Sequence, residues 1–362
     1  MSPISFVMAC FSILGALDLI IGNKFGLGKQ FERGLTLIGA MAMSMVGMLV
    51  LAPLIAQLLG PVVSGMASVF GIEPSVVPAM ILANDMGGAP LAMEFASSEQ
   101  AGYFNGLVVS AMMGVTISFN IPFAMGVVPK QKHEPLLLGM LCGIVTTPVG
   151  SLVAALVVGL PIKELLGSIL PLFLFAIVLA VLLFLFPKQC VKAFKVLGTA
   201  ITTIILIGLA AGIFEALTAI EIIPYTDPIE NAFDVCVNAA MVMSGAFPLV
   251  YILSKILDKP MRKLGGLIGV NAVSALGFVS TLATNVTTYG NMQDMDDKGA
   301  MLNGAFSVSA GFVFAGHLAF TLSFNGDYAL SMIIGKLVSG ISSVFVAVLL
   351  YKIMSKRMAK EK

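Results

Sequence analysis

Charged residues are scarce in this chain of 362 residues, where they make up 11% of the sequence against 58% hydrophobic residues. An ordinary soluble domain carries about 25% charged residues, and the mean hydropathy here is correspondingly high at +1.02. The composition therefore excludes a water-soluble globular protein. The net charge of +1 gives no sign of a nucleic-acid partner.

Tryptophan is absent, and cysteine is rare. Without Trp, an aromatic contact with a ligand must come from Phe or Tyr. The four cysteines (Cys10, Cys142, Cys190 and Cys236) are scattered and form no CxxC pair. Because free Cys commonly behaves as a small buried apolar residue, we interpret them as core residues and predict neither a metal site nor a cofactor.

Apolar stretches long enough to cross a bilayer recur along the whole chain. A spanning helix needs about 20 apolar residues, and the stretches that meet this length are roughly 3–22, 35–60, 103–128, 136–160, 168–187, 194–219, 235–257, 300–324 and 328–352. They leave no room for a soluble catalytic domain. We therefore predict an all-α polytopic membrane protein with about nine full spans, and not an enzyme.

Two polar interruptions occupy corresponding places in the two halves of the chain, at 81–90 (ILANDMGGAP) and 281–290 (TLATNVTTYG). The match continues downstream, where Asn105-Gly106 corresponds to Asn303-Gly304. Duplicated hydrophobic units broken by Gly and polar residues are typical of the binding site of a secondary transporter.

The predicted organisation follows from this duplication. A first repeat, 1–160, has a broken segment near 76–93, and a second repeat, 194–352, has one near 268–290. Between the repeats, 161–193 is a linking transmembrane helix, and 353–362 is a basic cytoplasmic tail.

Basic residues form five groups, at 24–33, 130–132, 188–195, 255–263 and 352–362. Short cytoplasmic loops are rich in Lys and Arg, so all five groups are expected inside. This requires both broken segments to be re-entrant, each entering and leaving on one side. All but Lys163 and Lys336 of the 20 basic residues then lie inside, and the two repeats are inverted. Ten or eleven full spans remain the alternative.

Asp85 is the strongest candidate for a binding residue, because an ionisable residue at membrane depth usually marks a site or pathway. It follows Asn84 and precedes Gly87 and Gly88, which permit non-helical backbone and close approach of a ligand. Pro90 prevents a regular helix from running through. We predict that these residues bind a cation; the alternative is a buried turn in which Asp85 caps the next half-helix.

The second interruption keeps the shape of the first without its charge, since Asn285 stands in the place of Asp85. Thr284 and Thr288 are further candidates for substrate binding. Their side chains are equally suited to hydrogen bonds with the local backbone.

Three ionisable residues outside the interruptions are candidates for gating or charge compensation. Lys336, about eight residues into the last stretch, needs a carboxylate, a set of carbonyls or a deprotonated state. His317 is suited to proton relay near neutral pH, although a packing role is also open. Glu94 follows the first broken segment and is expected at the outer mouth.

Several separated motifs resemble the EutH family, membrane proteins of bacterial ethanolamine utilisation operons. They are Phe31-Glu-Arg-Gly34, Ala40-Met-Ala-Met-Ser-Met-Val-Gly47, Leu58-Leu-Gly-Pro61, Asp85-Met-Gly-Gly88, Gly316-His-Leu318 and Gly335-Lys-Leu337. The resemblance runs through nearly the whole chain. It implies import of ethanolamine, a small amine cation, across the bacterial cytoplasmic membrane.

The energetics and the exact substrate stay open at this stage. The membrane potential draws a monovalent cation inward by about 2.3 kcal/mol per 100 mV, so we favour potential-driven facilitated diffusion. The alternatives are an ion-coupled (H⁺ or Na⁺) symporter of another small amine or amino acid and a membrane sensor without transport. A homo-oligomer is compatible with the sequence.

The distribution of basic residues predicts an external N-terminus and a cytoplasmic C-terminus. A reporter that is active only in the cytoplasm, fused after Lys362, should therefore be active. Activity confined to a reporter that requires the periplasm would contradict the re-entrant arrangement of the broken segments.

Overall fold

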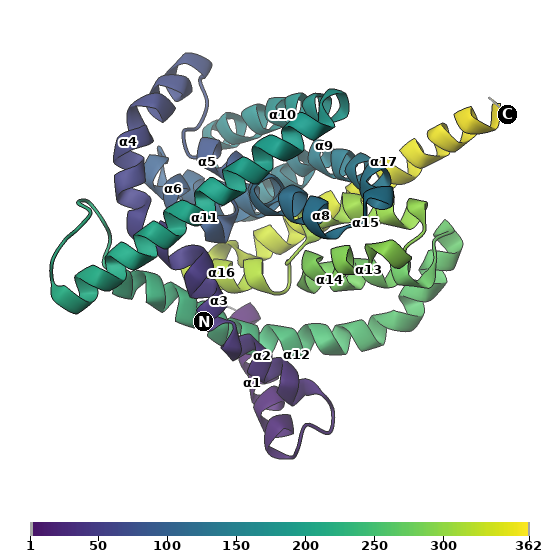
Figure 1. Ribbon diagram of the computed structural model, residues 1–362, viewed down its shortest axis with the longest axis horizontal. Helices are drawn as coiled ribbons and strands as arrows, with labels where there is room; N and C mark the ends of the chain where they lie inside the picture. The colour runs from purple at the N-terminus through teal and green to yellow at the C-terminus, as the bar shows by residue number, and fades with distance from the viewer. Residues whose placement is uncertain (1–2, 361–362) are drawn as a thin grey trace.

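The computed structural model describes residues 3–360, and every regular element within that range is helical (Figure 1). Eight helical stretches are long and apolar enough to cross a membrane: Pro3–Ile20, Leu27–Phe70, Glu99–Val127, Lys130–Val158, Ile162–Leu185, Pro187–Thr218, Ile229–Ile268 and Gly316–Ser355. The prediction of an all-α polytopic membrane protein is confirmed.

The first repeat region and the linking helix contain the following helices: α1 (Pro3–Ile20), α2 (Leu27–Thr36), α3 (Ile38–Met41), η1 (Ala42–Val46), α4 (Gly47–Phe70), α5 (Val76–Ile81), η2 (Asn84–Met86), α6 (Gly88–Phe95), α7 (Glu99–Phe104), η3 (Asn105–Gly114), η4 (Thr116–Asn120), α8 (Ile121–Val127), η5 (Lys130–Lys132), α9 (His133–Val158) and α10 (Ile162–Leu185). The elements η1, η3 and η4 are π-helical. The stretch from α7 to α8 is one nearly continuous, deeply buried helix.

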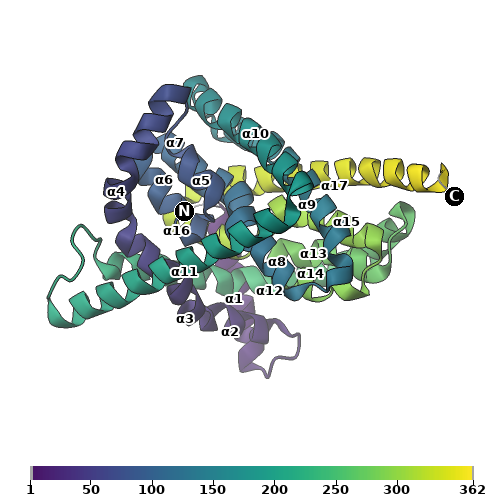
Figure 2. The same ribbon diagram turned by 45° about the horizontal axis from the view of Figure 1, so that its top comes forward.

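The remaining helices are α11 (Pro187–Thr218), α12 (Ile229–Ile268), α13 (Ala272–Ala283), α14 (Asn285–Gly290), η6 (Met292–Asp294), α15 (Asp297–Ala310), α16 (Gly316–Asn325), η7 (Gly326–Tyr328) and α17 (Ala329–Lys360). In both views α11 lies across α4 and α8, and the last part of α17 extends beyond the bundle (Figures 1 and 2). Residues 361–362 of the predicted tail lie outside the described range.

Both broken segments are helical hairpins whose two ends meet. In the first, the backbone N–H of Ser97 donates to Glu73 Oε1 at 2.9 Å, and its hydroxyl donates to the same carboxylate. In the second, the backbone N–H of Asn271 donates to Asp296 Oδ1 at 2.9 Å, and its side chain donates to the carbonyl of Asp294 at 2.8 Å. Each segment therefore starts and finishes at one end of its hairpin, the geometry that a re-entrant segment requires.

Corresponding asparagines tie each hairpin to the helix that follows it. Asn105 Nδ2 donates to the hydroxyl of Ser75 at 2.8 Å. In the second half, Asn303 Nδ2 donates to the carbonyl of Ser274 at 2.8 Å. The register found in the sequence thus extends to contacts in the structure, while the inversion of the two repeats relative to a membrane stays a prediction.

The stretch 300–324, expected as one span, is two helices separated by residues 311–315. Phe312 adopts a left-handed conformation with φ of 62°. Its N–H and that of Phe314 donate to Thr281 O at 3.1 Å and Leu282 O at 3.0 Å. These bonds satisfy carbonyls at the end of α13 that the break after Ala283 leaves without helical partners, which is the physical reason for the division.

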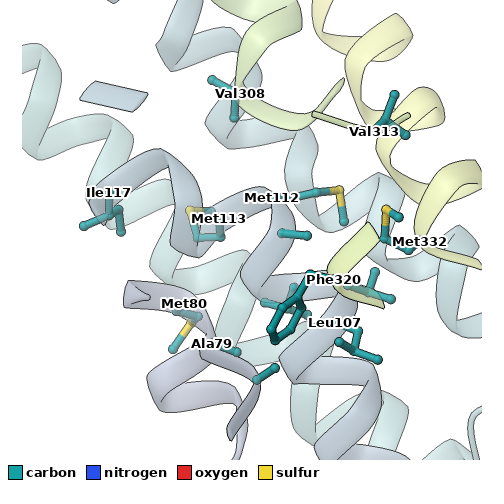
Figure 3. Packing of buried hydrophobic residues seen from close by; sticks show 14 of the residues in the cluster. Ala79, Met80, Leu107, Met112, Met113, Ile117, Val308, Val313, Phe320 and Met332 are labelled. Atoms are coloured by element: carbon teal, nitrogen blue, oxygen red, sulfur yellow. The ribbon is translucent and has the colours of Figure 1, made fainter. Parts of the chain in front are cut away.

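Small residues and flexible apolar side chains fill the centre of the bundle. A Cβ on Gly139 of α9 would lie 1.9 Å from the carbonyl oxygen of Met301 on α15, the close approach typical of membrane helices. Met112, Phe320 and Met332 lie together where η3, α16 and α17 meet (Figure 3). The interpretation of the cysteines as core residues holds for Cys142 and Cys236, which are buried, but is wrong for Cys10, which is exposed, and Cys190 is half-buried.

Candidate functional site

The turn between α5 and α6 depends on its two glycines. Gly87 adopts φ of 108°, a conformation that residues with a side chain rarely adopt. Gly88 has an ordinary φ, but an added Cβ would lie 2.3 Å from Ser110 Oγ and 2.5 Å from Leu82 O. Both glycines therefore shape the turn, and the polar residues Asn84 and Asp85 are held at its apex.

The Asp85 carboxylate has no side-chain partner. The residue is half-buried, and within the described part of the chain no other side chain gives it a hydrogen bond or an ion pair. The two ion pairs found there, Lys132–Asp297 and Arg262–Asp258, lie elsewhere. The alternative role as a helix cap has no support in the contacts of α6, whose N-cap residue is Gly87 and carries no side-chain cap bond.

Buried polar groups without partners surround the turn. Asn84 is fully buried, and neither its Oδ1 nor its Nδ2 has a hydrogen-bond partner within the protein. The hydroxyls of Ser110 and Thr321 are also buried without a hydrogen-bond partner. Their elements, η3 and α16, both pack against η2. Unpaired buried polar groups are rare in folded proteins and call for a specific explanation. A polar ligand beside the turn would supply the missing partners.

Lys336 and His317, which the sequence treats as separate candidates, are in direct contact. Lys336 is fully buried on α17, and its Nζ donates to the carbonyl of Ala111 and lies 3.0 Å from His317 Nδ1. The imidazole is also buried and lies against the ring of Phe312, with centroids 5.1 Å apart. Lys336 and Asp85 form no ion pair with each other; the elements that carry them, α17 and η2, both pack against η3 and α16.

The candidates of the second interruption all have protein partners. Asn285 Nδ2 donates to Asn120 Oδ1 at 2.8 Å and to Ser307 O at 3.0 Å. Thr284 Oγ1 accepts from the N–H of Val286 and caps α14. Thr288 Oγ1 lies 2.8 Å from Thr281 Oγ1 and donates to Gly277 O. These contacts favour a structural role, and ligand binding by the three residues stays a prediction.

Two cavities are lined in part by residues of the turn or of α6. One, of about 180 Å³, is lined by Pro90 and by the carboxylates of Glu94 and Asp227. The other, of about 600 Å³, is lined by Met86 in the turn and by Lys195 on α11. Glu94 thus lines a cavity, and its place at the outer mouth stays a prediction.

Sequence reasoning missed several residues of this region. Asn120 is a polar residue within an apolar span, and this feature of the sequence could have identified it as a candidate. Thr321 lies one helical turn after His317, on the same face. Ser110 and Ala111 carry no such signal, because small residues are common in any membrane helix.

Comparison with known proteins gives a consistent result. Residues 2–350 match the family model described as "Ethanolamine utilisation protein, EutH". The chain is 41% identical over 359 residues to the "Probable ethanolamine permease EutH" of Listeria monocytogenes, covering 99% of this chain and 96% of that protein. It is 34% identical over 385 residues to the protein of that name from Salmonella typhimurium, covering 96% and 94%. It is also 35% identical over 342 residues to the uncharacterized protein YxeR of Bacillus subtilis, covering 94% and 92%. No solved structure matches significantly.

The contrast between Asn84 and Asn285 predicts opposite effects of one substitution. Asn285→Leu removes the donor that serves Asn120 and Ser307 and should destabilise the protein by about 1–3 kcal/mol. Asn84→Leu removes a buried amide that has no protein partner, so stability should stay the same or rise. Thermal unfolding of the purified variants in detergent measures both. A loss of stability in Asn84→Leu as large as that in Asn285→Leu would show that Asn84 has an essential contact within the protein.

Proposed function

Because the chain belongs to the EutH family of ethanolamine utilisation proteins, we propose that it carries protonated ethanolamine into the cell across the cytoplasmic membrane. The observation that carries the proposal is the Asp85 carboxylate, partly exposed in a helix break and without a side-chain partner. The primary amine of ethanolamine resembles that of a lysine side chain, which titrates at about 10.4 in water, and is protonated at neutral pH. One carboxylate neutralises one such ammonium.

The rest of the substrate matches the surroundings of Asp85. Ethanolamine has a hydroxyl that donates one hydrogen bond and accepts others, and two carbons separate this hydroxyl from the nitrogen. The unpaired amide of Asn84 offers both a donor and an acceptor next to the carboxylate. The hydroxyls of Ser110 and Thr321 offer further partners. In this arrangement the substrate satisfies groups that would otherwise be buried at a cost.

The two cavities support a transport cycle at this turn. The carboxylates of Glu94 and Asp227 attract cations to the acidic cavity beside α6, and a second cavity is lined by Met86 of the same turn. A carrier exposes its site alternately to the two sides by moving one part of the bundle against another. Broken helices at the site suit this cycle, because their non-helical residues can change conformation without disrupting a full span.

For the driving force we infer facilitated diffusion of the cation down the membrane potential. A symporter of another amine or an amino acid remains the competing function, and an amino acid would require a cation for its carboxylate. Buried Lys336, which contacts Ala111 and His317, is the candidate for that cation, so substrate competition is the deciding test. Competition of ethanolamine uptake by choline, alanine and Na⁺ separates these substrates.

Asp85→Asn should abolish saturable ethanolamine uptake, because the neutral amide that replaces the carboxylate does not neutralise an ammonium at membrane depth. Asp85→Glu should retain partial activity with a weaker apparent affinity. Uptake of labelled ethanolamine into proteoliposomes measures both effects. Asp258→Asn is the matched control, since it removes an exposed carboxylate whose surface ion pair with Arg262 contributes little. Wild-type uptake by well-folded Asp85→Asn would place the substrate site elsewhere.

Uptake should follow an inside-negative potential without any gradient of pH or Na⁺. The potential acts on a monovalent cation with about 2.3 kcal/mol per 100 mV. Proteoliposomes with a potassium diffusion potential provide the measurement, and vesicles containing Asp85→Asn correct for leakage of the neutral amine. Uptake that begins only when a proton or Na⁺ gradient is added would identify a symporter.

A further inference from the structure

In the proposed transport cycle, the empty binding site must return to face the outside without substrate. In this step the negative charge of Asp85 has no partner. When ethanolamine leaves, the Asp85 carboxylate loses its cation. An unpaired carboxylate at membrane depth is costly, so the returning carrier needs a replacement. Carriers that couple to Na⁺ or H⁺ use the coupled ion for this purpose, whereas facilitated diffusion offers none.

Lys336 is positioned to be that replacement. Its Nζ is a primary amine, the same group as in ethanolamine, and the side chain is fully buried. The elements around it are in mutual contact: η3 packs against α17, α16 packs against both α17 and η2, and η2 carries Asp85.

The present contacts of Lys336 hold the ammonium away from Asp85. They are the carbonyl of Ala111, which accepts a hydrogen bond from Lys336, and Nδ1 of the His317 imidazole. A hydrogen bond to an ionised carboxylate is stronger than one to a neutral acceptor such as a carbonyl. The backbone of α17 is fixed beside them, because a Cβ on Gly335 would lie 2.7 Å from the Cβ of Ala154. The four-carbon stem of a lysine is flexible, so its ammonium can move while the helix stays in place.

We propose that Lys336 is a tethered substitute for the substrate cation. Its ammonium neutralises Asp85 while the empty carrier returns, and it withdraws to Ala111 and His317 when ethanolamine binds. The structure shows the withdrawn position, in which the carboxylate is free. This inference rests on the proposed function and explains how a cation carrier works without a coupling ion.

The test separates net transport from exchange, because exchange does not require the empty carrier to return. In Lys336→Met, net uptake into empty proteoliposomes should fall by about tenfold or more, since the unpaired carboxylate raises the barrier to return. Uptake of labelled ethanolamine into vesicles preloaded with unlabelled ethanolamine should stay within about twofold of the wild-type rate. Lys336→Arg keeps the charge and should recover part of the net uptake.

Lys298→Met provides the matched control. Lys298 also donates to a helix carbonyl, that of Ile268, but lies outside the site, and its replacement should leave the ratio of net uptake to exchange unchanged. Wild-type net uptake by Lys336→Met would overturn the inference while leaving the proposed function intact. Loss of exchange together with net uptake in a folded variant would also overturn it, and would make Lys336 necessary for substrate binding. Absence of any uptake by the wild-type protein would instead refute the proposed function.

A second variant tests the inference if Lys336→Met does not fold. His317→Leu removes one of the two acceptors of the withdrawn position, so the ammonium competes more strongly with substrate for Asp85. The KM for ethanolamine should rise several-fold while the maximal exchange rate changes little. An unchanged KM in folded His317→Leu would contradict the proposal that the Lys336 ammonium and ethanolamine compete for Asp85.

Discussion

The cost of placing charge in an apolar interior governs the organisation of this protein. Among the residues whose side chains the structure describes, the buried charged ones are Asp18, Glu73 and Lys336. Asp18 accepts hydrogen bonds from three backbone N–H groups and Glu73 from Ser75 and Ser97, as expected for buried ions without a countercharge. Asp85 differs because it is partly exposed and, within the described chain, no other side chain donates to it. The protein thus stabilises these buried charges internally, and under the proposed function the Asp85 carboxylate is neutralised by the substrate cation.

The helix breaks that hold this carboxylate create a second cost, since each break leaves backbone groups without partners. Neighbouring side chains and backbone groups supply hydrogen-bond partners to the backbone at these breaks. In the first half, Ser118 Oγ accepts from the N–H of Ala83 at 3.1 Å. In the second half, the backbone of residues 312–314 fulfils this role for the end of α13. Each break is therefore supported by the helix that follows its hairpin, and the hairpin and that helix form one unit.

Hydropathy, the position of the polar interruptions and the matching asparagines were sufficient to predict an all-α membrane protein with two broken segments. The division of 300–324 escaped prediction because the break depends on tertiary hydrogen bonds to Thr281 and Leu282, which no local pattern of the sequence displays. The contact between Lys336 and His317 was equally hidden, since it joins two helices that are separated along the chain. Composition indicates which residues are costly to bury, whereas tertiary packing decides which of them meet.

The two interruptions share a shape and differ in chemistry, and the difference follows from what each polar group can bond. Asn285 is engaged with Asn120 and Ser307, so the second turn is held rigidly against the long helix of the first half. Asn84, at the position preceding Asp85, has no protein partner at all. A duplicated unit of this kind provides one rigid turn and one responsive turn from the same backbone design. Under the proposed function, substrate binds at the first turn, and the contacts of the second turn hold it against the long helix.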